Sequence, residues 1–310
     1  PALRKDEAES CPKVHPFEKR QAVAITLASS YDDWCMAQMA KELGKEDDFT
    51  FFIKRSLNYR NLFREDTGFY HPKDSAGYWI EPFDYRYDGG MGARDYYDEN
   101  NGWTYIWQPY HAFGDLIEMM GGPEKFDNKL DRLFTEGLGK SKWQYYSTFP
   151  DATGNVGQYV MGNEPSMHIP YLYNLAGKPW KTQKRVRMLM DTWFRNDLMG
   201  VAGDEDGGGL SAFYVFSAMG FYPITPGVPE YQIGSPLFNK VMIRLQNGKT
   251  FSVIAKNNSL VNKYIQSAKL NGKELTKPVF GHTGLIEGGT LVLEMGDKPN
   301  RKWGIHERVN

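Results

Sequence analysis

An acidic loop followed by glycines is the most distinctive chemical feature of the sequence. Asp204, Glu205 and Asp206 precede three glycines, and the apolar segment after them repeats at helical spacing. Asp204 and Asp206 can project to one side of a turning backbone, and glycine lets a ligand approach the backbone closely. The loop therefore suits a metal ion or a water nucleophile. The alternative interpretation is a solvated acidic turn that caps the helix, because the positive end of the helix dipole favours carboxylates.

Two further loops carry carboxylates. One contains Glu99 and Trp103 just before an expected helix, and the other contains Asn163 and Glu164. If helical hairpins pack around a common centre, loops that enter alternate helices meet at one end and bring these acids together. Several carboxylates beside aromatic side chains indicate glycoside hydrolysis, which needs one protonated carboxyl and one ionised carboxylate. Such a site also suits calcium, a hard cation that takes oxygen ligands from loops.

Helical periodicity dominates the elements that must position these loops. The first expected helix runs over about residues 20–43, and the second begins with a cap at Asp47 and ends near residue 63. Further helices are expected over residues 103–120, from Pro123 to 134, in a segment that ends at residue 176, over residues 179–199, and from residue 210 to about 221. The stretches at 67–101 and 139–162 show no sustained period, so we expect long loops there.

After residue 222 the pattern changes to alternation with short turns. Residues 241–245 and 251–255 alternate on either side of Asn247-Gly248, which predicts a β-hairpin. Further turns are predicted at residues 271–272 and 288–289, with a late strand over 291–295. The sequence therefore predicts a helical part over residues 1–222 and a small antiparallel β-rich unit over residues 223–310.

Composition excludes several classes of protein. The chain has 37 basic and 38 acidic side chains, so its formal net charge of −1 gives no reason to expect nucleic acid or an anionic membrane as a partner. Two cysteines are too few for a disulfide scaffold. No apolar run reaches the length of a membrane span. Aromatic residues make up 15% of the chain, which is consistent with stacking on sugar rings but also with a large core.

Five segments carry a resemblance to a known family. They are Gly-Asn-Glu-Pro-Ser-Met-His-Ile-Pro-Tyr-Leu-Tyr at 162–173, Asp-Glu-Asp-Gly-Gly-Gly-Leu-Ser-Ala at 204–212 with Ser-Ala-Met-Gly-Phe-Tyr-Pro at 217–223, Tyr-Asp-Asp-Trp-Cys at 31–35, and Arg-Ser-Leu-Asn-Tyr-Arg-Asn-Leu-Phe at 55–63. These segments resemble glycoside hydrolase family 92, whose members are calcium-dependent, inverting, exo-acting α-mannosidases. The resemblance covers nearly the whole chain from about residue 20.

The resemblance implies catalytic roles for three carboxylates. Glu99 stands in Glu-Asn-Asn-Gly-Trp, where the family has a Glu-Gly-Asn-Ala-Trp-like motif that contains the general acid. Asp206 is implied as the base that activates water, with Asp204 assisting or holding the water. The acid and the base are over a hundred positions apart, so they can flank the sugar from opposite faces.

The resemblance also implies binding residues. The expected substrate contacts are Asn163, Glu164, His168 and Trp103. The expected calcium ligands are the backbone carbonyl of Met167 and the side chains of Asp206 and Glu164. His168 taken alone is more often a structural histidine, and Met167-His168 stands where many relatives have His-His.

The implied architecture is larger than this chain. An (α/α)₆ barrel needs about twelve helices after an N-terminal β-sandwich, whereas this sequence offers roughly half that number before its β unit. We therefore expect a C-terminal portion, with the missing N-terminal part of the same protein and a mannose-containing glycan as partners. We expect a periplasmic, cell-surface or secreted location. Two alternatives stay open: another inverting α-toroid glycosidase, and a non-catalytic carbohydrate-binding fragment.

Overall fold

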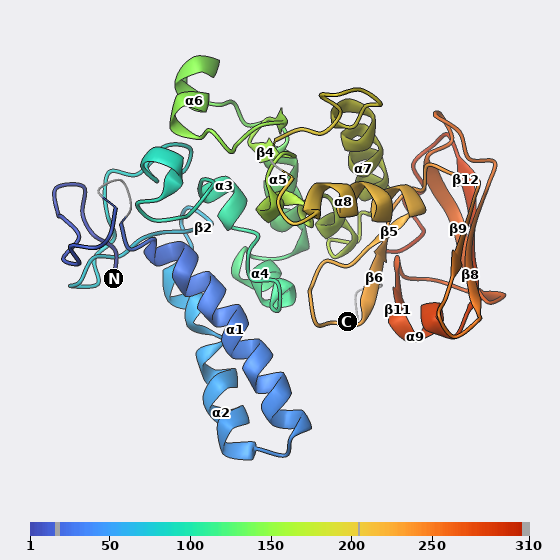
Figure 1. Ribbon diagram of the computed structural model, residues 1–310, viewed down its shortest axis with the longest axis horizontal. Helices are drawn as coiled ribbons and strands as arrows, with labels where there is room; N and C mark the ends of the chain where they lie inside the picture. The colour runs from blue at the N-terminus through green and yellow to red at the C-terminus, as the bar shows by residue number, and fades with distance from the viewer. Residues whose placement is uncertain (16–18, 204, 306–310) are drawn as a thin grey trace. The chain divides into compact units, whose positions relative to one another are not determined.

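The computed structural model describes residues 1–15, 19–203 and 205–305, so the predicted catalytic residue Asp204 lies outside the described residues. The chain forms two compact units, Pro1–Ser166 and Met167–Asn310. Figure 1 labels helices and strands of both units.

The first unit contains the amino-terminal helices. Its helices are α1 (Ala22–Glu42), α2 (Glu46–Arg55), η1 (Asn58–Leu62), η2 (Met91–Ala93), α3 (Gly102–Tyr105), α4 (Phe113–Met119), α5 (Pro123–Leu133), α6 (Lys142–Thr148) and η3 (Glu164–Ser166). Its strands form two short antiparallel pairs, β1 (Phe63–Arg64) with β2 (Phe69–Tyr70) and β3 (Asn155–Val156) with β4 (Tyr159–Val160).

The hairpin of α1 and α2 confirms the first predicted helix (Figure 1). Val23, Leu27 and Ala37 recur at helical spacing on α1 and are buried. The second prediction was wrong in two respects. Asp47 lies inside the first turn of α2 and does not cap it, and α2 ends at Arg55. Its acidic first turn and basic last turn complement the helix dipole without a side-chain cap.

Two other helix predictions needed correction. The helix predicted over residues 103–120 is divided into α3 and α4, and Pro109 lies in the gap, where it provides no backbone N–H and restricts the residue before it. The stretch at 139–162 contains α6, which begins with a capping box between Ser141 and Gln144. By contrast, α5 begins with Pro123 in its first turn, as predicted.

A carboxylate network joins η1 to α4 in the first unit. Asp115 accepts hydrogen bonds from the Tyr59 hydroxyl and from the Arg60 guanidinium, whose Nε lies 2.8 Å from Oδ2. Burial opposes ionisation of Asp115, but the hydrogen bonds from Arg60 and Tyr59 outweigh it, so the pKa of this carboxyl is below its ordinary value.

We expect Asp115→Asn to lower the free energy of unfolding by about 1.5–3 kcal/mol at neutral pH, because it removes charged hydrogen bonds. A depressed carboxyl pKa stabilises the fold above the ordinary aspartate pKa, and this contribution is lost as the pH falls through the folded-state value. The difference between variant and wild type should therefore shrink in acid. Urea unfolding at pH 7 and at pH 3 measures this difference in the free energy of unfolding. A difference that does not depend on pH would mean that the ionised Asp115 carboxylate does not stabilise the fold.

The second unit combines helices with two sheets. Its helices are η4 (Ile169–Asn174), α7 (Pro179–Trp193), α8 (Gly209–Met219) and α9 (His282–Ile286). Its strands are β5 (Phe221–Tyr222), β6 (Glu230–Ile233), β7 (Lys240–Arg244), β8 (Thr250–Lys256), β9 (Tyr264–Leu270), β10 (Lys273–Glu274), β11 (Val279–Gly281) and β12 (Gly289–Gly296). The segment predicted to be helical up to 176 is the 3₁₀ helix η4, and α7 ends six residues before the predicted 199.

The larger sheet has the strand order β10-β9-β12-β8-β7. Figure 1 labels its strands β8, β9 and β12. The predicted hairpin is formed by β7 and β8, the predicted turn at residues 271–272 joins β9 to β10, and β12 contains the predicted late strand. All pairs in this sheet are antiparallel except β12 with β8, which is parallel. The buried faces of these strands and of the β11-β6-β5 sheet share one apolar core that includes Phe251, Leu291 and Leu293. Within the described ranges, no helix is both long enough and apolar enough to cross a membrane.

Candidate active site

Glu99 lies in the loop that leads into α3. The loop is anchored on both sides of Glu99, since the Asn101 side chain caps α3 by accepting from the Trp103 N–H at 3.1 Å. On the other side, the Tyr97 hydroxyl donates to the Tyr70 carbonyl at 3.0 Å. The carboxyl of Glu99 is therefore held on a short, well-connected segment although the segment itself is not helical.

The carboxyl of Glu99 is half-buried, and Asn163 is its hydrogen-bond partner. Asn163 Nδ2 lies 3.2 Å from Glu99 Oε2. Burial raises the pKa of Glu99 above its ordinary value, and the charges of Asp98 and Asp151 add to this effect, whereas the Asn163 hydrogen bond and Arg94 oppose it. A carboxyl whose pKa is raised keeps its proton to higher pH, which is what a general acid requires.

Trp103 is buried and takes part in the packing behind this loop. Its ring meets Phe69 edge to face, with the centroids 5.0 Å apart. The Lys129 ammonium lies 3.1 Å from the centroid of Phe69 and 5.0 Å from that of Trp103, a cation–π arrangement. Burial lowers the pKa of Lys129 to about 7. These neighbours show that the indole anchors α3 against β2 and α5.

A cavity of about 280 Å³ lies beside the same loop. One face of α1 and the segment around α3 line it, and the lining residues are Gln21, Ala24, Ile25, Leu27, Ala28, Tyr31, Asp32, Asp98, Tyr105, Gln108 and Tyr110. Tyr110 donates to Gln108 Oε1, and Gln108 Nε2 donates to the Pro165 carbonyl at 2.9 Å. Aromatic rings and hydrogen-bonding groups on one wall are typical of small-molecule sites.

The loop at residues 163–168 crosses the boundary between the two units. Asn163 and Glu164 belong to the first unit, where Asn163 is buried and Glu164 begins η3. Met167 and His168 belong to the second unit, and both are buried. The structure thus brings Asn163 to Glu99, and it places the predicted calcium ligand Met167 and the predicted substrate contact His168 immediately before η4.

The acidic loop precedes α8 in the second unit. Glu205 accepts hydrogen bonds from the backbone N–H and the hydroxyl of Ser211, both at 3.0 Å, so this acid has the capping role that sequence reasoning left open for the whole loop. Asp206 is exposed, and no side chain in the described ranges is hydrogen-bonded to its carboxylate. Gly208 just before α8 has φ 84°, a conformation that favours glycine.

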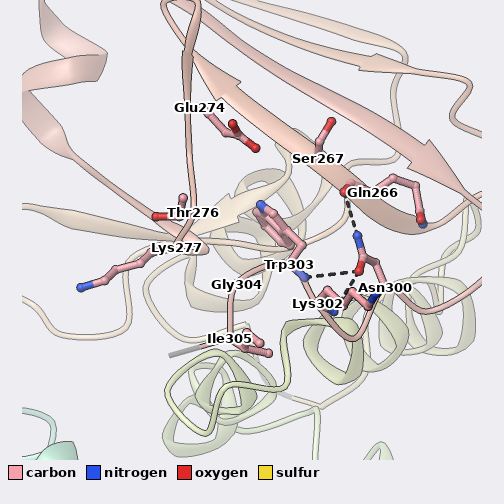
Figure 2. A pocket seen from close by; sticks show the side chains of 10 residues that line it. All are labelled: Gln266, Ser267, Glu274, Thr276, Lys277, Asn300, Lys302, Trp303, Gly304 and Ile305. Atoms are coloured by element: carbon pink, nitrogen blue, oxygen red, sulfur yellow. Dashed lines mark hydrogen bonds between the residues drawn. The ribbon is translucent and has the colours of Figure 1, made fainter. Parts of the chain in front are cut away.

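A larger cavity, of about 700 Å³, lies in the second unit away from the predicted catalytic residues in sequence. Figure 2 shows Asn300 at its edge, with Nδ2 donating to the Gln266 carbonyl and Oδ1 accepting from the backbone of Lys302 and Trp303. The Trp303 indole N–H donates to the Leu275 carbonyl. This cavity contains none of the predicted site residues.

Sequence comparison decides the family. Residues 9–297 match the glycosyl hydrolase family 92 catalytic domain. The chain belongs to glycosyl hydrolase family 92.

Solved structures are similar to this family 92 chain. A family 92 α-mannosidase from Bacteroides thetaiotaomicron in complex with mannoimidazole is 35% identical with a TM-score of 0.85, covering 93% of this chain and 38% of that one. A family 92 inverting mannosidase from the same organism is 40% identical with a TM-score of 0.81, covering 92% and 39%.

A curated relative, an uncharacterised secreted glycosidase of Arthroderma benhamiae, is 33% identical over 92% of the family 92 chain and 36% of its own length. The chain therefore spans between about a third and two fifths of the length of these relatives.

Proposed function

We propose that the protein is a calcium-dependent, inverting exo-α-mannosidase that removes terminal mannose from α-1,2 or related linkages of N-glycans or mannans. The observation that carries the proposal is the half-buried Glu99, whose pKa is raised, in a family whose solved members include α-mannosidases. The inverting relative supports the stereochemistry.

The proposed chemistry divides between two carboxyls. Glu99 donates its proton to the glycosidic oxygen as the bond from that oxygen to the anomeric carbon breaks. Asp206 takes a proton from a water molecule, and the oxygen of that water forms the new bond to the anomeric carbon from the opposite face. This inverts the configuration and requires the two carboxyl groups to stand about 6.5–9.5 Å apart. We assign Asp204 to holding the water.

Binding contacts complete the proposal. We propose that Asn163, Glu164, His168 and Trp103 contribute to the substrate site. Asn163 Oδ1 is buried and accepts no hydrogen bond from the described residues, so a sugar hydroxyl would satisfy it. The packing of Trp103 on Phe69 supports an indirect role, because its ring is already covered.

Calcium fits the chemistry of the proposed donors, all of which are oxygens: the side chains of Glu164 and Asp206 and the carbonyl of Met167. In the described ranges, no three His, Cys, Asp or Glu side chains cluster around one point, so carbonyl, water or sugar oxygens would complete the shell. A bound calcium ion would supply a charge that orients sugar hydroxyls. The buried acceptor Asn163 Oδ1 beside Glu164 is consistent with a cation or donor nearby.

Turnover with and without a chelator tests both the activity and the ion. We expect hydrolysis of an α-mannoside but not of the matched α-glucoside, loss of that activity in excess chelator, and recovery with calcium but not with magnesium. Calcium should also raise the melting temperature, because a ligand bound only by the folded state stabilises it. Full activity in excess chelator would contradict the calcium proposal, and preference for the glucoside would favour another α-toroid glycosidase.

We further propose that this chain forms part of an (α/α)₆ barrel that is completed by an N-terminal part of the same protein. The location we propose is periplasmic, cell-surface or secreted, supported by the relative described as secreted. A second candidate function, a carbohydrate-binding fragment without catalysis, is favoured by the aromatic cavity beside α1. Binding of mannosides without any turnover would distinguish it.

A further inference from the structure

Asn163 is hydrogen-bonded to Glu99, in addition to its proposed contact with the substrate. Its side chain is buried, with 4% exposure, and its amide nitrogen lies 3.2 Å from Glu99 Oε2 although the two residues are 64 positions apart. Its backbone carbonyl accepts from the Ser166 N–H at 3.2 Å. Gln108 holds the next part of the same loop through the Pro165 carbonyl. The amide is therefore presented to Glu99 by a segment that is itself tied down.

We propose that Asn163 is a positioning residue that keeps the catalytic proton of Glu99 on Oε1. The inference rests on the proposed role of Glu99 as general acid. In a carboxylic acid the carbonyl oxygen is a better hydrogen-bond acceptor than the hydroxyl oxygen, so the amide N–H favours Oε2 as the carbonyl oxygen and the proton on Oε1. A protonated carboxyl with two equivalent oxygens would present its proton in the productive direction only part of the time.

The same hydrogen bond affects when Glu99 loses its proton. An N–H that donates to a carboxylate favours the ionised form. Around Glu99, the charged groups are Asp98 and Asp151, which oppose ionisation, and Arg94, which favours it. Asn163 thus lowers a pKa that burial and two acids raise, so that the group remains able both to hold and to release its proton near the working pH.

Carbon-13 NMR titration of the Glu99 carboxyl in the purified protein tests the inference without any need for turnover. Asn163→Leu keeps the volume of the side chain and removes the N–H, and we expect the pKa of Glu99 to rise by about one pH unit, the equivalent of one charged hydrogen bond. Asn163→Ala should shift it in the same direction, which covers the case in which the leucine variant fails to fold. The Glu99 resonance is assigned by its absence in Glu99→Gln.

Gln108→Leu is the matched control, because Gln108 donates to the same loop but not to Glu99. Because the Asn163 N–H stays in place, we expect the pKa of Glu99 to change much less than in Asn163→Leu. A downward shift in Asn163→Leu would overturn the inference, because it would mean that the amide oxygen accepts the Glu99 proton and that the proton lies on Oε2. An unchanged pKa in both Asn163 variants would also overturn it.

Infrared difference spectra identify the oxygen directly. The C=O stretch of protonated Glu99 should move to higher frequency in Asn163→Leu, since a carbonyl oxygen that loses a hydrogen bond stiffens. In turnover, Asn163→Leu should lower kcat about tenfold for poor leaving groups and move the alkaline limb of the pH profile upward. Wild-type protein that hydrolyses no α-mannoside would refute the proposed function, whereas the two spectroscopic results would still decide whether Asn163 directs the proton.

Discussion

Glu99→Gln should lower the hydrolysis of a disaccharide α-mannoside by about 10²–10⁴-fold. The amide cannot donate a proton to the glycosidic oxygen, and a sugar alkoxide is a poor leaving group without one. The hydrolysis of an activated aryl α-mannoside should fall far less, because its phenolate leaves without protonation. Steady-state kinetics on both substrates measure the difference, which is the signature of a general acid.

Asp98→Asn provides the matched control for Glu99→Gln. Asp98 is the neighbouring carboxylate and forms an ion pair with Arg94 at 3.4 Å, yet the proposal gives it no proton transfer. We expect this variant to keep the wild-type dependence on the leaving group. In the wild type, activity should fall as the pH rises through the raised pKa of Glu99, because the proton is then lost. If Glu99→Gln lowered the hydrolysis of both substrates by the same factor, Glu99 would not be the general acid.

Asp206→Asn should lower turnover by about 10²–10⁴-fold on the disaccharide and on the aryl substrate alike. The attack of water needs the base whatever the leaving group is, so the two substrates should lose activity together. In the wild type, the first-formed product should be β-mannose, which proton NMR of the anomeric signal detects in the first minutes. Initial α-mannose would indicate a retaining path and would exclude a water-activating base.

Glu205→Gln is the control for Asp206→Asn. Glu205 hydrogen-bonds to Ser211 at the start of α8, so its loss should affect stability more than chemistry. We expect this variant to give β-mannose first and to keep most of its turnover. A loss as large as that of Asp206→Asn would show that the loop acts through its overall charge and not through one base.

Local sequence signals predicted much of the fold, and they failed where a tertiary contact or a single residue outweighs periodicity. The repeat of Val23 and Leu27 predicted α1, and Pro123 marked the start of α5. The apolar residues between 103 and 120 kept a helical period across Pro109, which ends a helix whatever the period is. The helix α6 was predicted as part of a loop because residues 139–162 show no sustained period, although a capping box at Ser141 marks its start.

The site was predictable as a set of residue types but not as a set of contacts. The residue pattern marked Glu99 as one of several loop carboxylates, and the family resemblance gave it the role of acid, with which its raised pKa agrees. Sequence reasoning assigned Asn163 to substrate alone, because nothing local links residues 64 positions apart. Lys129 behind Trp103 was missed for the same reason, since only the packing of α5 on β2 brings its ammonium to the aromatic rings.

The position of β12 determines when the carboxy-terminal sheet can form during synthesis. This strand pairs with both β8 and β9, which are therefore not hydrogen-bonded to each other in the larger sheet. Until residue 296 has left the ribosome, β8 and β9 each present an edge without its neighbour, and such edges attract other chains. Translation that stops just before β12 would thus yield a nascent chain that depends on chaperones, whereas the eight residues of β12 complete the ladder on both sides at once.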